Sequence, residues 1–88
     1  MKLEYARSFE KDLRALRDSP ATGPLREILE ALKAASDLRG VTNVKKLQGG
    51  EGFYRIRVGD YRIGAILQAD TLVLVRFLHR KDIYRYFP

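Results

Sequence analysis

The chain has 88 residues, which is room for one small domain (residues 1–88) around a single hydrophobic core. Its 45% hydrophobic and 32% charged residues are ordinary for a compact fold, and the absence of cysteine excludes disulfides and thiolate metal sites. The formal net charge of +6 favours an anionic partner, either a phosphate backbone or an acidic protein, although such a surplus also occurs on surfaces that only keep a protein in solution.

The positive charge is concentrated in the second half of the chain. Residues 45–88 carry nine of the 17 basic side chains but only four of the 11 acidic ones. The first seven residues, Met-Lys-Leu-Glu-Tyr-Ala-Arg, are too charged for a signal peptide, and no apolar run approaches the roughly 18 residues of a membrane span. We therefore expect a cytoplasmic protein that does not contact membranes.

The first half of the chain predicts a short strand and two helices. Residues 2–6 alternate loosely between apolar and polar positions, which favours a strand. Ser8 is a candidate N-cap for a helix that ends at Ser19-Pro20, and a second helix is expected to begin near Pro24. Apolar residues at helical spacing give each helix one buried stripe: Phe9, Leu13 and Leu16 in the first, and Leu25, Ile28, Leu29 and Leu32 in the second.

A β-hairpin is predicted around the dipeptide Gly59-Asp60. Residues 53–58 and 61–67 flank it, and glycine at the first position of a two-residue turn supplies the positive φ that a type II′ turn requires. In this register Tyr54, Ile56 and Val58 share the apolar face, so the arginines of the hairpin lie on the other face.

The same register sets Arg57 opposite Arg62, and Arg55 opposite Gly64, where a gap would let a ribose or base approach. Like charges directly opposite one another destabilise a sheet, so we interpret the pair as holding an anion rather than as arginines that only point into water. Guanidinium groups bind phosphate oxygens bidentately and keep their charge, which suits RNA cleavage through the RNA's own 2′-hydroxyl, because the enzyme then needs no nucleophile.

Residues 71–78 are apolar on both faces and predict an inner strand. A two-residue turn at 69–70 would put Arg76 on the apolar face, whereas a bulge would move it to the basic face. The tail from His79 leaves the sheet and could form a turn of helix. The predicted fold class is α+β: two N-terminal helices packed on one face of a small antiparallel sheet, with the opposite face open and basic.

Further candidate residues flank the hairpin. His79 is a candidate acid or base because imidazole changes protonation near neutral pH, although a lone histidine at a strand end is more often structural. Tyr84 could stack on a base or offer its phenol to an RNA hydroxyl, or it could fasten the tail to the core. Lys45 and Lys46 are candidates for binding RNA phosphates, or are simply solvated. No metal-ligand cluster, phosphate loop, dinucleotide fingerprint or catalytic triad is present, so we expect no metal and no cofactor.

Three motifs together resemble the RelE family of toxins, within the RelE/ParE superfamily. They are Val-Lys-Lys-Leu-Gln-Gly at 44–49, Phe-Tyr-Arg-Ile-Arg-Val-Gly-Asp-Tyr-Arg-Ile at 53–63, and His-Arg-Lys-Asp-Ile-Tyr at 79–84. The resemblance implies the toxin of a type II toxin–antitoxin pair. Such a toxin cleaves mRNA in the ribosomal A site, leaves a 2′,3′-cyclic phosphate, inhibits translation and is silenced by a cognate antitoxin that wraps around it.

The resemblance also implies a set of catalytic residues. Carried over motif by motif, they are Arg55 and Arg57 of Tyr-Arg-Ile-Arg, Arg62 of Tyr-Arg-Ile, Arg80 of His-Arg-Lys, and Tyr84 of Asp-Ile-Tyr. Some members have lysines at the first two positions. Because a guanidinium does not give up its proton, we interpret these arginines as stabilisers of charge, which leaves proton transfer to His79, Tyr84 or the ribosomal RNA.

Two other classes of function stay open at this point. The related ParE branch inhibits DNA gyrase and does not need this catalytic set. A simple RNA- or DNA-binding module would use the arginines only to grip phosphates, with tight, salt-sensitive binding and no strand scission.

Overall fold

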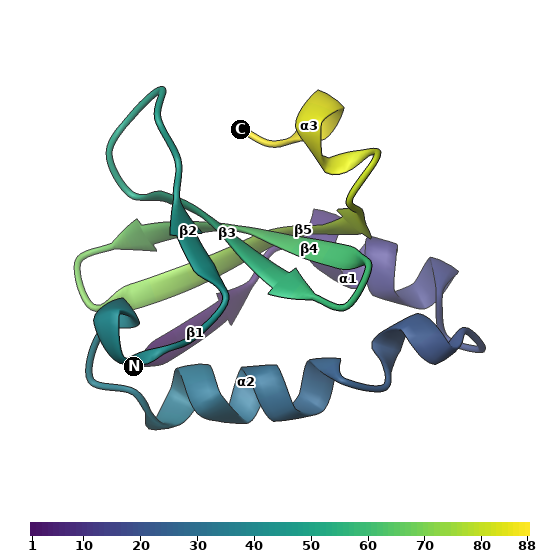
Figure 1. Cartoon of the computed structure of the whole chain (residues 1–88), viewed down its shortest axis with the longest axis horizontal. Helices are drawn as coiled ribbons and strands as arrows, with labels where there is room; N and C mark the ends of the chain where they lie inside the picture. Colours follow the sequence, from purple (N-terminus) through teal and green to yellow (C-terminus); the bar gives the residue numbers. More distant parts are fainter.

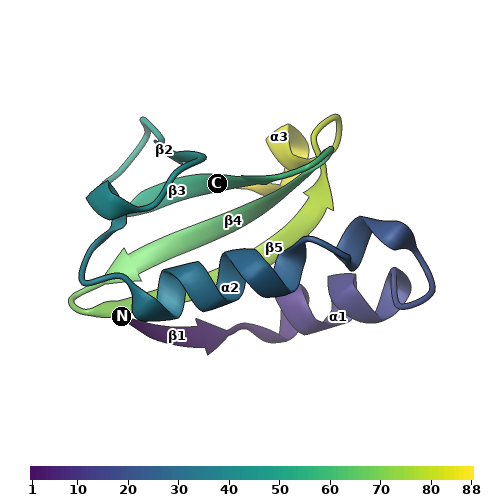
Figure 2. The same ribbon diagram turned by 60° about the horizontal axis from the view of Figure 1, so that its bottom comes forward.

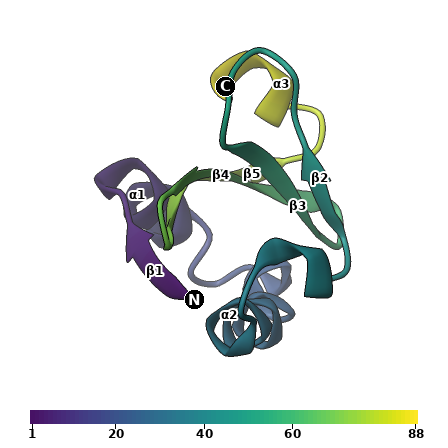
Figure 3. The ribbon, with the colours of Figure 1, turned by 90° about the vertical axis from the view of Figure 1, so that its left-hand side faces the viewer.

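The computed structural model describes residues 1–88. The elements are, in chain order, β1 (Lys2–Tyr5), α1 (Arg7–Ala15), a 3₁₀ turn (Pro20–Thr22), α2 (Leu25–Ala34), a second 3₁₀ turn (Leu38–Gly40), β2 (Val44–Lys46), β3 (Phe53–Val58), β4 (Tyr61–Gln68), β5 (Thr71–His79) and α3 (Ile83–Tyr86). The five strands form one sheet in the order β1-β5-β4-β3-β2. Viewed edge-on, the sheet lies between α2 on one side and α3 on the other (Figure 3).

The α+β class is confirmed, but the sheet is mixed rather than antiparallel. β2, β3, β4 and β5 pair antiparallel, as expected, whereas β1 runs parallel to β5 along its outer edge. Parallel neighbours need a long connection between them, and residues 6–70 lie between these two strands. The expectation that residues 71–78 form an inner strand is confirmed, because β5 has β1 on one side and β4 on the other.

The main core lies between the sheet and the two longer helices. α2 runs along the sheet, and α1 follows directly from β1 and lies beside β5 (Figure 2). The predicted apolar stripes of both helices pack into this core. No helix in the structure is long and apolar enough to cross a bilayer. The buried residues of this core are Phe9, Leu25, Leu32, Leu38, Ile56, Val58, Ile63, Ala65, Leu72, Leu74 and Phe77.

The start of α1 differs from the prediction. Ser8 is not the N-cap; Ala6 occupies that position and offers no capping side chain. The Ser8 hydroxyl instead donates a hydrogen bond to the carbonyl of Val75 in β5. The Ala6 N–H donates to the carbonyl of Leu74 at 2.9 Å. Hydrogen bonds to β5 therefore hold the start of this helix, where a capping side chain is more often found.

The hairpin register is confirmed. Arg57 lies opposite Arg62 and Arg55 opposite Gly64, and the turn has a positive φ of 59° at Gly59. Between β4 and β5 a register shift follows Gly64, so that Arg76 pairs with Gly64 and shares the face of Arg55. The bulge is thus the alternative that the structure adopts.

The face opposite α2 is less open than predicted. α3 and the C-terminal residues lie over it (Figure 1). A second small core forms there because the tail brings apolar side chains back onto the sheet. Its buried members are Leu47, Ile83 and Phe87, with Phe53, Ile66, Val75 and Leu78 partly buried against them.

Candidate functional site

An open hollow of about 350 Å³ lies on the α3 side of the sheet, and we call it the arginine hollow. The strand register explains why it is basic, since β2, β3 and β4 each contribute positions to the same face. α3 closes one side of it with an aromatic ring. The lining residues are Asn43, Val44, Lys45, Arg55, Arg57, Arg62 and Tyr84.

Arg55 and Tyr84 form a stacked pair in the arginine hollow. The guanidinium carbon of Arg55 lies 4.4 Å from the centre of the Tyr84 ring, which is the geometry of a cation–π contact. The Nε of Arg55 is shielded from solvent and has no hydrogen-bond partner within the chain. Tyr84 itself remains 70% exposed, so its phenol can reach a bound molecule.

Arg62 is held in place by the turn that precedes it. Its Nη1 donates to the carbonyls of Gly59 and Tyr61, both at 2.8 Å. Arg57, directly across the ladder, is exposed and makes no side-chain hydrogen bond or ion pair within the chain. One guanidinium is therefore preorganised, and the other is available to a ligand.

The carboxylates that pair with arginine lie elsewhere. Asp12 binds Arg76, with 2.8 Å between Oδ2 and Nε, and these hydrogen bonds raise the pKa of Arg76. Hydrogen bonds from Arg39 lower the pKa of Asp37. No carboxylate lies within 4.0 Å of a guanidinium nitrogen in the arginine hollow, so its positive charge is uncompensated within the chain. Such a surface attracts phosphates.

The lysines and Arg80 are placed differently. Lys45 lies opposite Arg55 and lines the arginine hollow. Lys46 lies opposite Tyr54 on the other face of the sheet by register, and lines only a neighbouring hollow, which it shares with Lys45 and Arg55. Arg80 does not line the arginine hollow; its Nε lies 4.0 Å from Asp60 at the turn of the hairpin.

His79 lies apart from the arginines. It pairs with Tyr61, which places it on the face that carries α1 and α2, and its ring contacts the Tyr61 ring edge-on at 5.4 Å. Its Nδ1 accepts a hydrogen bond from the N–H of Lys81 at 3.1 Å. The structure therefore gives His79 a local role in shaping the turn after β5 and does not bring it to the arginine hollow.

The expected gap at Gly64 is filled, which corrects the prediction of a ribose or base site there. The Phe87 ring occupies that space, and Phe87 is only 3% exposed. The sequence analysis missed Phe87, which fills this space beside the arginine hollow. A glycine inside an otherwise apolar strand was the available indication, because it often marks the close approach of another group.

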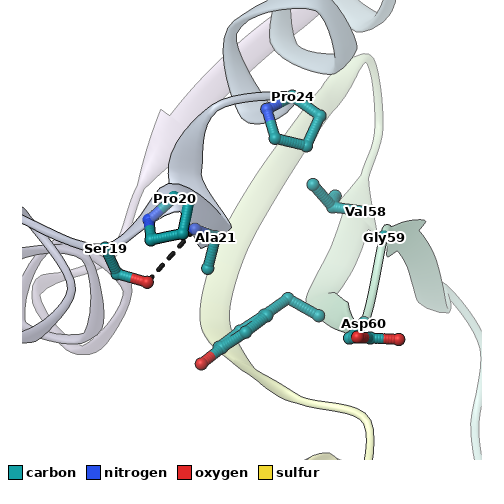
Figure 4. Close-up of a pocket in the computed structure, with 8 residues that line it drawn as sticks. Ser19, Pro20, Ala21, Pro24, Val58, Gly59 and Asp60 are labelled. Atoms are coloured by element: carbon teal, nitrogen blue, oxygen red, sulfur yellow. Dashed lines mark hydrogen bonds between the residues drawn. The ribbon is translucent and has the colours of Figure 1, made fainter.

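A second hollow, of about 370 Å³, lies between the turn before α2 and the turn of the hairpin (Figure 4). Its walls come from two short segments, Ser19–Ala21 with Pro24 on one side and Val58–Tyr61 on the other. Asp60 is its only charged lining residue. This hollow does not suit an anionic substrate, so the arginine hollow is the candidate site.

The facing arginines, Arg57 and Arg62, are expected to lower the stability of the hairpin. Arg57→Thr removes the like-charge pair from an exposed strand position, so we expect the free energy of unfolding to rise by roughly 0.5 kcal/mol. Denaturant titration measures this change. Arg57→Lys keeps the charge and is the control, for which no gain is expected. A loss of stability in Arg57→Thr would show that the pair is not repulsive.

The chain is similar to known proteins in both sequence and fold. The family model described as the ParE toxin of the type II toxin-antitoxin system parDE matches residues 3–84. The chain is 40% identical to Toxin RelE3 of Methanocaldococcus jannaschii, over the full length of both. The crystal structure of a RelB-RelE antitoxin-toxin complex from Methanococcus jannaschii matches with a TM-score of 0.79 and 38% identity, over 97% of this chain and 99% of that one. YafQ of E. coli, at 18% identity over 94% and 97% of the two chains, shares the fold with a TM-score of 0.73. The chain therefore belongs to the RelE family of toxins, within the RelE/ParE superfamily of type II toxin–antitoxin systems.

Proposed function

We propose that this toxin is an endoribonuclease that cleaves mRNA in the ribosomal A site and thereby inhibits translation. The observation that carries the proposal is the arginine hollow, where three guanidiniums and a tyrosine meet without a carboxylate. Uncompensated guanidiniums that line one hollow suit a phosphate whose negative charge grows during the reaction.

The reaction is an attack of the RNA 2′-oxygen on the adjacent phosphorus. The 2′-hydroxyl loses its proton as the new O–P bond forms, the bond from phosphorus to the 5′-oxygen breaks, and that oxygen gains a proton. The products are a 2′,3′-cyclic phosphate and a 5′-hydroxyl. In this proposal Arg57 and Arg62, from adjacent strands, bind the non-bridging phosphate oxygens. Their fixed positive charge there stabilises the transition state.

Proton transfer needs a different kind of group. A phenol can donate and accept a hydrogen bond, and Tyr84 is the exposed phenol of the arginine hollow. We therefore propose that Tyr84 gives a proton to the departing 5′-oxygen. The acceptor of the 2′-proton then comes from the ribosome, because His79 lies on the other face of the sheet. Lys45, Lys46 and Arg80 are assigned to neighbouring phosphates of the RNA.

We further propose that a cognate antitoxin silences the toxin. The RelB-RelE structure, to which this chain is similar over nearly its full length, is an antitoxin–toxin complex. The net charge of +6 favours an acidic partner.

The direct test is to map the 3′ ends of mRNA after brief induction of the toxin in cells. We expect new ends within codons, carrying 2′,3′-cyclic phosphates. Intact mRNA during growth arrest would contradict the proposal.

A second candidate function follows from the ParE description of the matching family model. A ParE-like protein would inhibit DNA gyrase by binding it. Supercoiling by purified gyrase in the presence of the toxin separates the two proposals, because inhibited supercoiling together with intact mRNA favours gyrase as the target.

A further inference from the structure

The C-terminal tail lies across a single row of the sheet. The row consists of neighbouring positions in β3, β4 and β5, at the point where the bulge shifts the register of β5. Side chains of one row share a face, so a group that crosses the sheet can contact them all. Three aromatic residues of the tail cover the three positions: Tyr84 over Arg55, Phe87 over Gly64, and Tyr86 over Arg76.

Phe87 is the buried anchor of this arrangement. A Cβ atom at Gly64 would come closer than 3.0 Å to three atoms of the Phe87 ring, so only glycine leaves enough space for it. Phe53 contacts the same ring edge-on, with 5.9 Å between the ring centres. The Phe87 N–H donates to the carbonyl of Ile83 at 2.9 Å, which ties the ring to the start of α3.

A second anchor holds the outer side of α3. The guanidinium of Arg76 lies 5.1 Å from the centre of the Tyr86 ring. Two hydrogen bonds from Arg76 to Asp12, at 2.8 and 3.1 Å, fix that guanidinium against α1. The ring of Tyr86 therefore rests on a side chain that has little freedom to move.

Tyr84 has no comparable support of its own. It is 70% exposed and makes no side-chain hydrogen bond within the chain. It belongs to a helix of only four residues, which is too short to be stable without packing. Its place over Arg55 thus depends on its packed neighbours in the tail, which are the buried Ile83 before it and the two anchors after it.

We propose that Phe87 is a positioning residue for RNA cleavage. By filling the space over Gly64, it holds Tyr84 over Arg55 and so presents the phenol to the arginine hollow. The inference rests on the proposed function, in which Tyr84 gives a proton to the departing 5′-oxygen. Phe87 itself does not touch the substrate.

Two opposite changes test the role of the anchor in the reaction. Phe87→Ala empties the space, and Gly64→Ala blocks it with a methyl group, so each is expected to release Tyr84. Because misplacing a catalytic group by about 1 Å can cost up to 100-fold, we expect each variant to lower kcat for ribosome-bound mRNA by about 10-fold or more, with little change in KM. Gly40→Ala is the matched control, since a Cβ there meets no atom within 4 Å, and it should cleave like the wild type.

Two further variants keep the test decisive. Phe87→Leu refills the space with an apolar side chain and should restore most of the lost kcat. The Gly64→Ala/Phe87→Ala double variant should lose no more activity than the worse single variant, because both changes act through the same contact. Additive losses, or a kcat unchanged in both single variants, would overturn the role of Phe87.

The placement of Tyr84 can also be read in the free protein, without ribosomes. The Tyr84 ring should shift the NMR resonance of the Arg55 Nε–H, and Tyr84→Ala should abolish the shift. We expect Phe87→Ala to move this resonance most of the way to its position in Tyr84→Ala. A resonance unmoved by Phe87→Ala would refute the positioning role whatever the reaction is. If instead the resonance moves but the wild type cleaves no mRNA, the proposed function fails while the placement stands.

Discussion

Arg62→Ala is expected to lower the rate of mRNA cleavage by about 100-fold or more while the protein stays folded. The guanidinium of Arg62 is held by two carbonyls of the hairpin turn, so it meets the developing charge without first having to reorganise. Single-turnover cleavage of mRNA on purified ribosomes measures the effect, and circular dichroism checks the fold.

Two controls sharpen this result. Arg62→Lys keeps the charge but loses the planar fork, so an intermediate rate is expected. Arg39→Ala removes an exposed arginine that is paired with Asp37 outside the arginine hollow, and it should leave the rate unchanged. If Arg62→Ala cleaved at the wild-type rate, the assignment of the arginine hollow as the active site would be wrong.

Asp12→Ala is expected to destabilise the protein strongly, lowering the free energy of unfolding by about 2–3 kcal/mol. The carboxylate accepts two hydrogen bonds from Arg76 and one, at 2.9 Å, from the N–H of Phe77. The Asp12 side chain is only 11% exposed, so its removal leaves a guanidinium and a backbone donor without their partner in a poorly solvated place. Urea denaturation measures the loss.

Glu30→Ala is the matched control for this change. It also removes a carboxylate from a helix, but the Glu30–Lys33 contact is long, at 3.9 Å, and both side chains are more than half exposed. Exposed pairs of this kind contribute little, so a change within about 0.5 kcal/mol is expected. Equal losses in the two variants would mean that Asp12 does not link α1 to β5 in the way described.

Local patterns in the sequence predict much of the fold. The alternation on both sides of Gly59 predicts the register that sets Arg57 against Arg62, and the register is confirmed because turn type and strand pairing are coupled. The apolar spacing of α1 and α2 predicts the faces that they bury. β2 escapes prediction because three residues are too few to show alternation.

The long-range contacts are not predictable in this way. The parallel pairing of β1 with β5 joins distant segments, and nothing within Lys2–Tyr5 encodes its partner. Ser8 has the chemistry of an N-cap, but a carbonyl of β5 takes its hydroxyl instead. Within the candidate site, the arginines follow from the hairpin alone, whereas Phe87 over Gly64 requires the tail to fold back onto the sheet.

One measurement tests most directly whether the arginine hollow promotes attack by the RNA's own 2′-oxygen. Ribosomes are programmed with an mRNA that carries a single 2′-deoxynucleotide at the cleavage position of the A-site codon, and cleavage is compared with that of the all-ribose mRNA. We predict rapid cleavage of the all-ribose mRNA and none at the deoxy position. Equal cleavage of both would contradict the account, because the nucleophile would then be something other than the 2′-hydroxyl.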